Sequence, residues 1–306
     1  MNTCPPELHS YIAQLACSSD PTTVHALSLV SQYFRQIAAP FLYQCLALST
    51  PSQIITLTPI LESTPQHMRN IHHLFLSIHP DPTNPSHTHT LIFRILTLAA
   101  PTLHSLTFVA PSPATSTPLI ARLFRTPFPA LIELTILGFY PFPPTQSSMP
   151  LLKRLHLAGN RNPHGLLQMG ALEDASPALT HLRISGLNTA LSFALELEHA
   201  LTNDTDADDP NTNPNTNPAS LFPAKLPPHT RRVLVQFGPS PQGMHRKCGT
   251  AQMKERAIMQ RLRALSGVKG AVEFTLLERS LGDVSGEVVR RQWAERLEGL
   301  EGCWAC

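Results

Sequence analysis

Cysteine and histidine are the residue types best suited to metal binding and redox chemistry, and both are scattered through this chain. The 306 residues include 6 cysteines and 15 histidines. Cys303 and Cys306 have the Cys-x-x-Cys spacing of redox-active thiols, and the same four residues fit a C-terminal prenylation pattern. Trp304 is not aliphatic, however, and no strand–helix unit is predicted around the pair. We therefore expect reduced thiols in a flexible tail over residues 300–306.

Two close histidine pairs, His72–His73 and His87–His89, have the residue type that zinc prefers. A structural zinc site needs further histidine or cysteine ligands at fixed spacings, and none follows either pair in the sequence. The sequence also has no glycine-rich phosphate loop, no nucleophile elbow and no paired histidines of a metallopeptidase. We therefore expect no catalytic residues, no metal and no cofactor. An enzyme would need a site that is assembled only in three dimensions.

A basic segment follows in the last third of the chain. Residues 231–270 contain nine lysines or arginines and a single acidic residue, Glu255. Such a segment suits nucleic acid or an acidic partner. No aromatic residues for base stacking alternate with the helical pattern at 251–265, which favours a solvated basic helix face. The net charge of the chain is only +2, so we expect neither nucleic acid nor a membrane surface as a partner.

The composition indicates many short elements. Charged residues make up 14% of the chain, against about a quarter in a typical protein, and the 30 prolines separate short apolar runs. Residues 1–6 lack the basic region and the apolar run of a signal peptide. The longest apolar stretch, residues 91–100, is too short to span a bilayer. We expect a soluble protein of the cytoplasm or the nucleus.

A proline-led cassette, Pro-x-Leu-x-x-Leu-x-apolar, recurs four times. Its second leucines are Leu106, Leu134, Leu155 and Leu182. The step from one copy to the next is therefore about 20 to 30 positions, in or near the range of leucine-rich repeats. Weaker copies begin at residues 71, 231 and 271. The asparagine that usually follows the strand in such repeats is mostly replaced by glycine.

Each cassette ends in the alternating pattern of a half-buried strand, and helix-like runs lie between cassettes at 91–98, 118–124 and 191–201. Strands and helices in this order place parallel strands side by side. The prediction is therefore an α/β fold, an irregular leucine-rich-repeat-like solenoid over 49–202 and 220–299. We expect the helix at 286–297 to form its C-terminal cap. The acidic and Asn/Pro-rich residues 203–219 are expected to form a disordered loop.

The polar positions of the cassette strands are predicted to form a concave strip that contacts a target protein. A solvated surface is the alternative for any one of these positions. The candidate contact residues are His104, Thr107, Glu133, Thr135, Arg154, His156, His181 and Arg183.

The N-terminal segment, residues 1–48, has the pattern of short amphipathic helices. Leu8, Ile12 and Leu15 share one helical face, and a second helical pattern runs from Val24 to Phe34. A unit of this size cannot bury its apolar face alone. The module must therefore pack on the following domain as a cap, or bind another protein.

Two stretches of this module, residues 5–8 (PPEL) and 29–43 (LVSQYFRQIAAPFLY), resemble the F-box in the form common in large fungal families. The resemblance implies docking onto the small linker protein, and through it the cullin scaffold, of an SCF ubiquitin ligase. The rest of the chain would then be the substrate-recognition part of a non-enzymatic adaptor in protein ubiquitination. The alternative is a scaffold without a ligase. By the resemblance, the docking residues are Pro6, Leu8, Ile12, Leu27, Leu29, Val30 and Phe34.

Overall fold

The computed structural model describes residues 5–19, 21–78, 85–141, 147–168, 170–188, 190–202, 224–239, 249–266 and 272–305. The chain divides into two compact units. Unit 1 comprises Met1–Pro111, Phe128–Leu131 and Ser285–Cys306, and unit 2 comprises Ser112–Pro127 and Ile132–Val284. The loop predicted at 203–219 lies outside the described residues.

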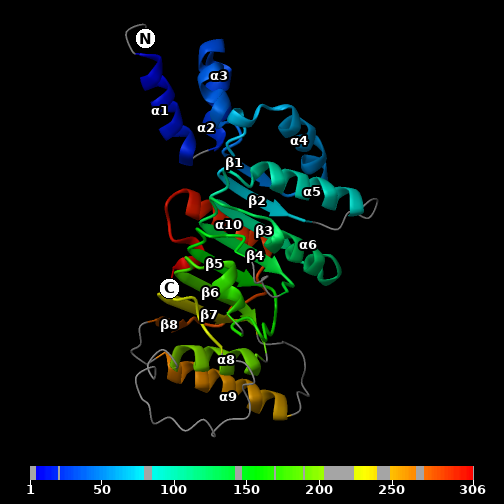
Figure 1. Ribbon diagram of the computed structural model, residues 1–306, viewed down its shortest axis with the longest axis vertical. Helices are drawn as coiled ribbons and strands as arrows, with labels where there is room; N and C mark the ends of the chain where they lie inside the picture. The colour runs from blue at the N-terminus through cyan, green and yellow to red at the C-terminus, as the bar shows by residue number, and fades with distance from the viewer. Residues whose placement is uncertain are drawn as a thin grey trace. The chain divides into compact units, whose positions relative to one another are not determined.

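Unit 1 contains three helices at its start, then strands that alternate with helices (Figure 1). Its elements are α1 (Pro6–Ser19), α2 (Pro21–Val30), α3 (Gln32–Ala38), η1 (Ala39–Phe41), β1 (Cys45–Leu48), α4 (Pro51–Ser63), η2 (Gln66–Met68), β2 (His73–Ser77), α5 (Pro85–Ala99), β3 (Ser105–Ala110), α10 (Gly286–Leu297) and η3 (Gly302–Trp304).

Unit 2 continues the same alternation. Its elements are α6 (Pro113–Arg125), β4 (Glu133–Gly138), β5 (Arg154–Ala158), α7 (Ala171–Ala175), β6 (His181–Leu187), α8 (Leu191–Thr202), β7 (Arg232–Phe237), α9 (Gly249–Leu265) and β8 (Glu273–Leu276). The helices expected at 91–98, 118–124 and 191–201 are confirmed as parts of α5, α6 and α8. Among the described residues, no helix combines the length and the apolar character that a bilayer crossing needs.

The strands of each unit pair in parallel and in chain order. In unit 1, β2 lies between β1 and β3, and in unit 2 the pairs run from β4 to β8. Within unit 2, the second leucine of one cassette is in register with that of the next, as the pairs Leu134–Leu155 and Leu155–Leu182 show. These leucines are buried. The predicted α/β class and the parallel alignment of cassettes are thus confirmed within each unit.

A column of glycines explains why asparagine is missing after the strands. A Cβ on Gly159 would lie 2.8 Å from the backbone nitrogen of Gly138, so only glycine permits this close approach. Gly159 also has φ +98° and Gly186 has φ +82°, a region that side chains with a Cβ rarely adopt. The backbone at Gly159, directly after β5, therefore packs directly on that of Gly138 at the end of β4.

Helix α10 does not cap the end of the strand array, which corrects the sequence prediction. It packs on β2 and β3 within unit 1 (Figure 1). Trp293 of α10 contacts Phe75 of β2 with 5.7 Å between ring centroids, and Val289, one helical turn earlier in α10, is buried as well. Helix α10 thus packs its apolar face on strands that lie far away in the sequence.

The tail also differs from the prediction of a flexible segment over 300–306. Residues Gly302–Trp304 form η3, which contacts α10, and both Cys303 and Trp304 are buried. Burial of a large indole is a strong enough apolar contribution to order so short a segment. Cys306 lies outside the described residues.

Candidate protein-binding surfaces

The first three helices form a small module, defined here as residues 6–42, with its own apolar centre. Val24 of α2 and Ala38 of α3 are buried against each other, and Leu27, Phe41 and Leu42 pack on them. Helix α1 contacts both α2 and α3. The sequence therefore folds into a compact helical unit although its apolar residues are few.

Polar contacts fix the junction between α2 and α3. Ser31 is the N-cap of α3, and its side chain accepts a hydrogen bond from the backbone N–H of Phe34 (3.2 Å). Arg35 Nε donates to the carbonyl of Ser28 (3.1 Å). An N-cap bond of this kind contributes about 1 kcal/mol. The tight turn between these helices therefore has a local cause.

An aromatic cluster joins the start of α1 to the start of α3. The Nδ1 atom of His9 lies 2.8 Å from the hydroxyl oxygen of Tyr33. The rings of His9, Tyr33 and Phe34 have centroids 5.5–5.9 Å apart. Phe34 is half-buried in this cluster, so it supports the module from within.

The module exposes an apolar stripe along α1. Leu8, Tyr11, Ile12 and Leu15 follow the i, i+3, i+4, i+7 pattern of one helix face, and each is at least half exposed. At the end of α2, Leu29 and Val30 are 79% and 65% exposed. Because His9 contacts Tyr33, the start of the stripe and the α2–α3 junction belong to the same end of the module. We call these exposed side chains the apolar stripe of the module.

The residues implied by the F-box resemblance fall into two groups in the structure. Pro6, Leu8, Ile12, Leu29 and Val30 are exposed, whereas Leu27 and Phe34 are half-buried. Sequence reasoning did not select the exposed Tyr11 and Tyr33. The helical period that selected Leu8 and Ile12 also includes Tyr11, so the signal was present.

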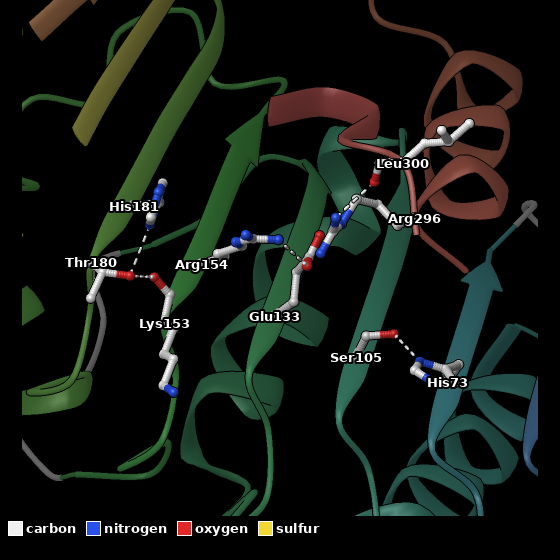
Figure 2. A network of polar contacts seen from close by, with 9 residues as sticks. All are labelled: His73, Ser105, Glu133, Lys153, Arg154, Thr180, His181, Arg296 and Leu300. Carbon is white, nitrogen blue, oxygen red and sulfur yellow. Dashed lines mark hydrogen bonds and ion pairs between the residues drawn. The ribbon is translucent and has the colours of Figure 1, made fainter. Parts of the chain in front are cut away.

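The predicted concave strip divides into rows because the strands pair in register. The first row of unit 2, at the starts of the strands, runs Glu133, Arg154, His181, Arg232, Glu273. Arg154 Nη1 lies 3.7 Å from Glu133 Oε2, and Arg232 Nε lies 3.7 Å from Glu273 Oε2. Figure 2 shows Arg154 pointing towards Glu133, and Thr180 between the Lys153 carbonyl and His181. This row is half-exposed.

The second row of unit 2 is buried, which corrects the prediction of an exposed strip. Thr135, His156 and Arg183 are neighbours in register, and all are less than one-tenth exposed. His156 Nε2 lies 3.0 Å from Ser185 Oγ, to which Arg183 Nε also donates (3.1 Å). Polar side chains of adjacent strands thus bind one another instead of water.

The position of Arg183 has an electrostatic effect on its neighbour. Arg183 Nη2 donates to Gln236 Oε1 (2.8 Å), and Gln236 donates in turn to the carbonyl of Glu278 (3.1 Å). Burial, followed by the charge of Arg183, lowers the pKa of His156 well below its ordinary value. His156 is therefore neutral in the folded protein. Its Nδ1 atom is buried without a hydrogen-bond partner among the described residues.

In unit 1 the corresponding positions are also partly covered. Thr107 of β3 is buried on the strands that α10 covers, so it is not accessible to a target. His104 stacks on His72 with a centroid distance of 4.7 Å, and Figure 2 shows the neighbouring His73 pointing towards Ser105. Burial and then the charge of His104 lower the pKa of His72. No group of three potential metal ligands occurs among the described residues.

A buried carboxylate in unit 2 was missed by the sequence analysis. Glu196 of α8 is 7% exposed, and its Oε1 atom accepts from His164 Nδ1 (2.7 Å), the Gly165 backbone N–H (2.6 Å) and Gln168 Nε2 (3.3 Å). Its Oε2 atom lies 3.5 Å from the Leu167 backbone nitrogen. These contacts fasten the loop after β5 to α8, and we call them the Glu196 clamp.

The basic helix α9 lies beside α8 (Figure 1). Arg261 forms an ion pair with Glu198 of α8 at 2.5 Å, whereas Arg256 and Arg263 are exposed. Ile258 and Leu262 are buried on the opposite side of the helix. The structure thus gives α9 one apolar face and one basic face.

These observations define the class of the protein as an α/β protein in which consecutive parallel strands follow a three-helix module with exposed apolar side chains. A comparison with models of known protein families finds none that matches the chain. A comparison with curated proteins gives no match either.

Proposed function

We propose that this protein is a substrate-recognition adaptor of an SCF-type ubiquitin ligase. In this proposal the module of residues 6–42 is an F-box that docks on the linker protein, and the strand array is an irregular leucine-rich-repeat-like solenoid that holds a target. The apolar stripe of the module carries the proposal. A compact helical unit that keeps Leu8, Ile12 and Leu29 in water is expected to have a protein partner.

The positions of the exposed side chains support docking in preference to capping. A cap would bury its apolar side chains on the next domain. The module instead buries only a small centre around Val24 and Ala38, while five of the seven residues implied by the F-box resemblance are exposed. The stripe is therefore available to another chain.

The arrangement of the strands supports the second part of the proposal. Successive cassettes pair in parallel and in chain order within each unit, and their leucines are in register. The glycine column replaces the asparagine of a regular repeat. These features agree with an irregular leucine-rich-repeat-like array.

The adaptor itself would perform no bond-making or bond-breaking step. It would hold the target near the ubiquitin carrier of the ligase, which raises the effective concentration of the target's lysines. In this proposal, the covalent chemistry of ubiquitin transfer belongs to other subunits of the ligase.

The test is direct binding of the full chain to purified linker protein, measured by biolayer interferometry. The test variant is Leu8→Asp plus Ile12→Asp, since both side chains are at least half in solvent and the changes leave the module's centre intact. Central apolar contacts contribute about 2 kcal/mol each, so we expect binding to weaken at least about 100-fold.

The matched control is Ile55→Asp plus Ile60→Asp on α4, because both isoleucines are 46% exposed. We expect this control to bind the linker protein as the wild type does. Equal binding by wild type and test variant, or no binding by the wild type, would reject the docking proposal. The alternative of a scaffold without a ligase would then be preferred.

A further inference from the structure

The starts of β5, β6 and β7 bring several positively charged side chains close together in unit 2. Arg154, His181 and Arg232 are paired in register, and Arg231 directly precedes β7. We call the three arginines the cationic row. Figure 2 shows Arg154 and His181 on their neighbouring strands. The acidic residues of the same register row, Glu133 and Glu273, lie only on its outer strands, β4 and β8.

The charges of the cationic row all act on His181. The pKa of His181 is lowered first by burial, then by Arg154, Arg232 and Arg231, and only Glu273 opposes this effect. Three guanidinium groups therefore produce a positive potential at the centre of the row. Glu133 and Glu273 lie 3.7 Å from Arg154 and Arg232, respectively, so two carboxylates face three guanidinium groups and a net positive charge remains.

We propose that the cationic row is a docking site for an extended, acidic polypeptide segment. Adjacent strands are about 4.8 Å apart, so Arg154 and Arg232 are separated by about 10 Å, which is close to three residues of an extended chain. Carboxylates about three residues apart on one segment therefore match Arg154 and Arg232. Each guanidinium presents several N–H donors and retains donors for a second carboxylate.

The location of the row makes it suitable for such a segment. Arg231 is exposed and Arg154 is one-third exposed, whereas the next row towards the strand ends, with His156 and Arg183, is buried. A partner would thus meet the row at the rim of the sheet and not in a deep pocket. Buried Arg183 adds a further positive charge behind the rim.

This inference rests on the proposed function only in taking this face as the target-binding part of the adaptor. The test needs no ligase subunit. The probe is a short fluorescein-labelled peptide in which every third residue is glutamate and the others are serine, and binding to the full chain is followed by fluorescence anisotropy. Asp204, Asp206, Asp208 and Asp209 are replaced by asparagine in every protein used, so that the chain's own aspartates do not compete.

The test variant is Arg154→Gln plus Arg231→Gln. We expect it to bind the peptide about tenfold more weakly, since two exposed ion pairs are lost. The matched control is Arg256→Gln plus Arg263→Gln on α9, which removes the same charge from exposed positions of the same unit. The parent protein carries only the four Asp→Asn changes. We expect the control to bind the peptide as this parent protein does.

A second measurement does not depend on any arginine substitution. Binding of the glutamate peptide to the parent protein is expected to weaken steadily as salt is raised, and a peptide with glutamine in place of glutamate is expected not to bind. Any of three results would overturn the proposal: the α9 control loses as much affinity for the peptide as the test variant, the test variant binds with undiminished affinity, or the glutamine peptide binds. Tighter binding of a single-stranded oligonucleotide through the same arginines would overturn the choice of a polypeptide partner. Docking to the linker protein is measured separately, so either proposal can fail alone.

Discussion

The Glu196 clamp allows a sharp prediction about stability. In Glu196→Ala, the backbone N–H groups of Gly165 and Leu167 lose their acceptor, and so does His164. A hydrogen bond to a charged group contributes about 1.5–3 kcal/mol, and a buried donor left unpaired costs about 1–3 kcal/mol. Removing the carboxylate also removes its own desolvation cost, which offsets part of the loss. We expect a net destabilisation of about 3 kcal/mol.

The variant Glu196→Gln separates acceptor geometry from charge. The amide oxygen can keep the three contacts that Oε1 makes, and only the weak contact of Oε2 with the Leu167 N–H is replaced by a facing donor. We expect this variant to lose only about 1 kcal/mol. The matched control is Glu198→Ala on the same helix, which breaks the exposed ion pair with Arg261 and is expected to cost at most about 1 kcal/mol.

The assay combines thermal unfolding, followed by circular dichroism, with hydrogen–deuterium exchange of the loop that contains Gly165 and Leu167. For a unit of this size, about 3 kcal/mol corresponds to a fall in Tm of about 6–12 °C. Faster exchange at these amides is expected in Glu196→Ala alone. The reasoning is refuted if Glu198→Ala destabilises as strongly as Glu196→Ala, or if the loop amides keep their protection.

Three further outcomes are expected. Gly159→Ala should lower the free energy of unfolding by at least about 2 kcal/mol, because the new Cβ would clash with backbone atoms and φ is positive at this position. Urea unfolding measures this change, and an unchanged free energy of unfolding would contradict the close packing of the glycine column. Trp293→Ala should lower the free energy of unfolding by about 3 kcal/mol or more, because it removes the contact with Phe75. Arg291→Ala changes an exposed residue of the same helix and should leave stability almost unchanged. Equal Tm values for the two variants would contradict the packing of α10 on β2. The pKa of His156 is lowered on folding, so the unfolded chain binds the extra proton and stability falls as the pH drops below the ordinary histidine pKa of 6.5. The contribution of His156 to the slope of the free energy of unfolding against pH should approach about 1.4 kcal/mol for each pH unit and be absent in His156→Gln. Equal slopes in the wild type and in this variant would contradict the lowered pKa of His156.

The register of the strands could be predicted from the sequence, because each cassette puts a leucine at the same point of its strand. A shift by one residue would move Leu155 to the other face of the sheet, so the pattern strongly determines the pairing. Helix α4 was not predicted, although its signals are visible in the sequence. Thr50 and Gln53 form a capping box, and Pro51 occupies the first turn.

Other features have no local signal. Alternation along a strand tells which residues share a face, but it does not tell whether that face is covered. Thr107 and His156 have the pattern of surface residues, and they are buried by contacts with segments far away in the sequence. Glu196 is similar, because the partners of its carboxylate lie about thirty positions earlier in the chain and no motif connects them.

The place of α10 has a consequence for synthesis of the protein on the ribosome. Strands β2 and β3 emerge early, but the helix that shields Phe75 follows β3 by more than half of the chain's length. At about 5–20 residues per second, the nascent chain would keep this aromatic side chain uncovered for roughly ten seconds or more. Prematurely released products would carry the helical module without the shielding helix, which makes them natural clients of chaperones.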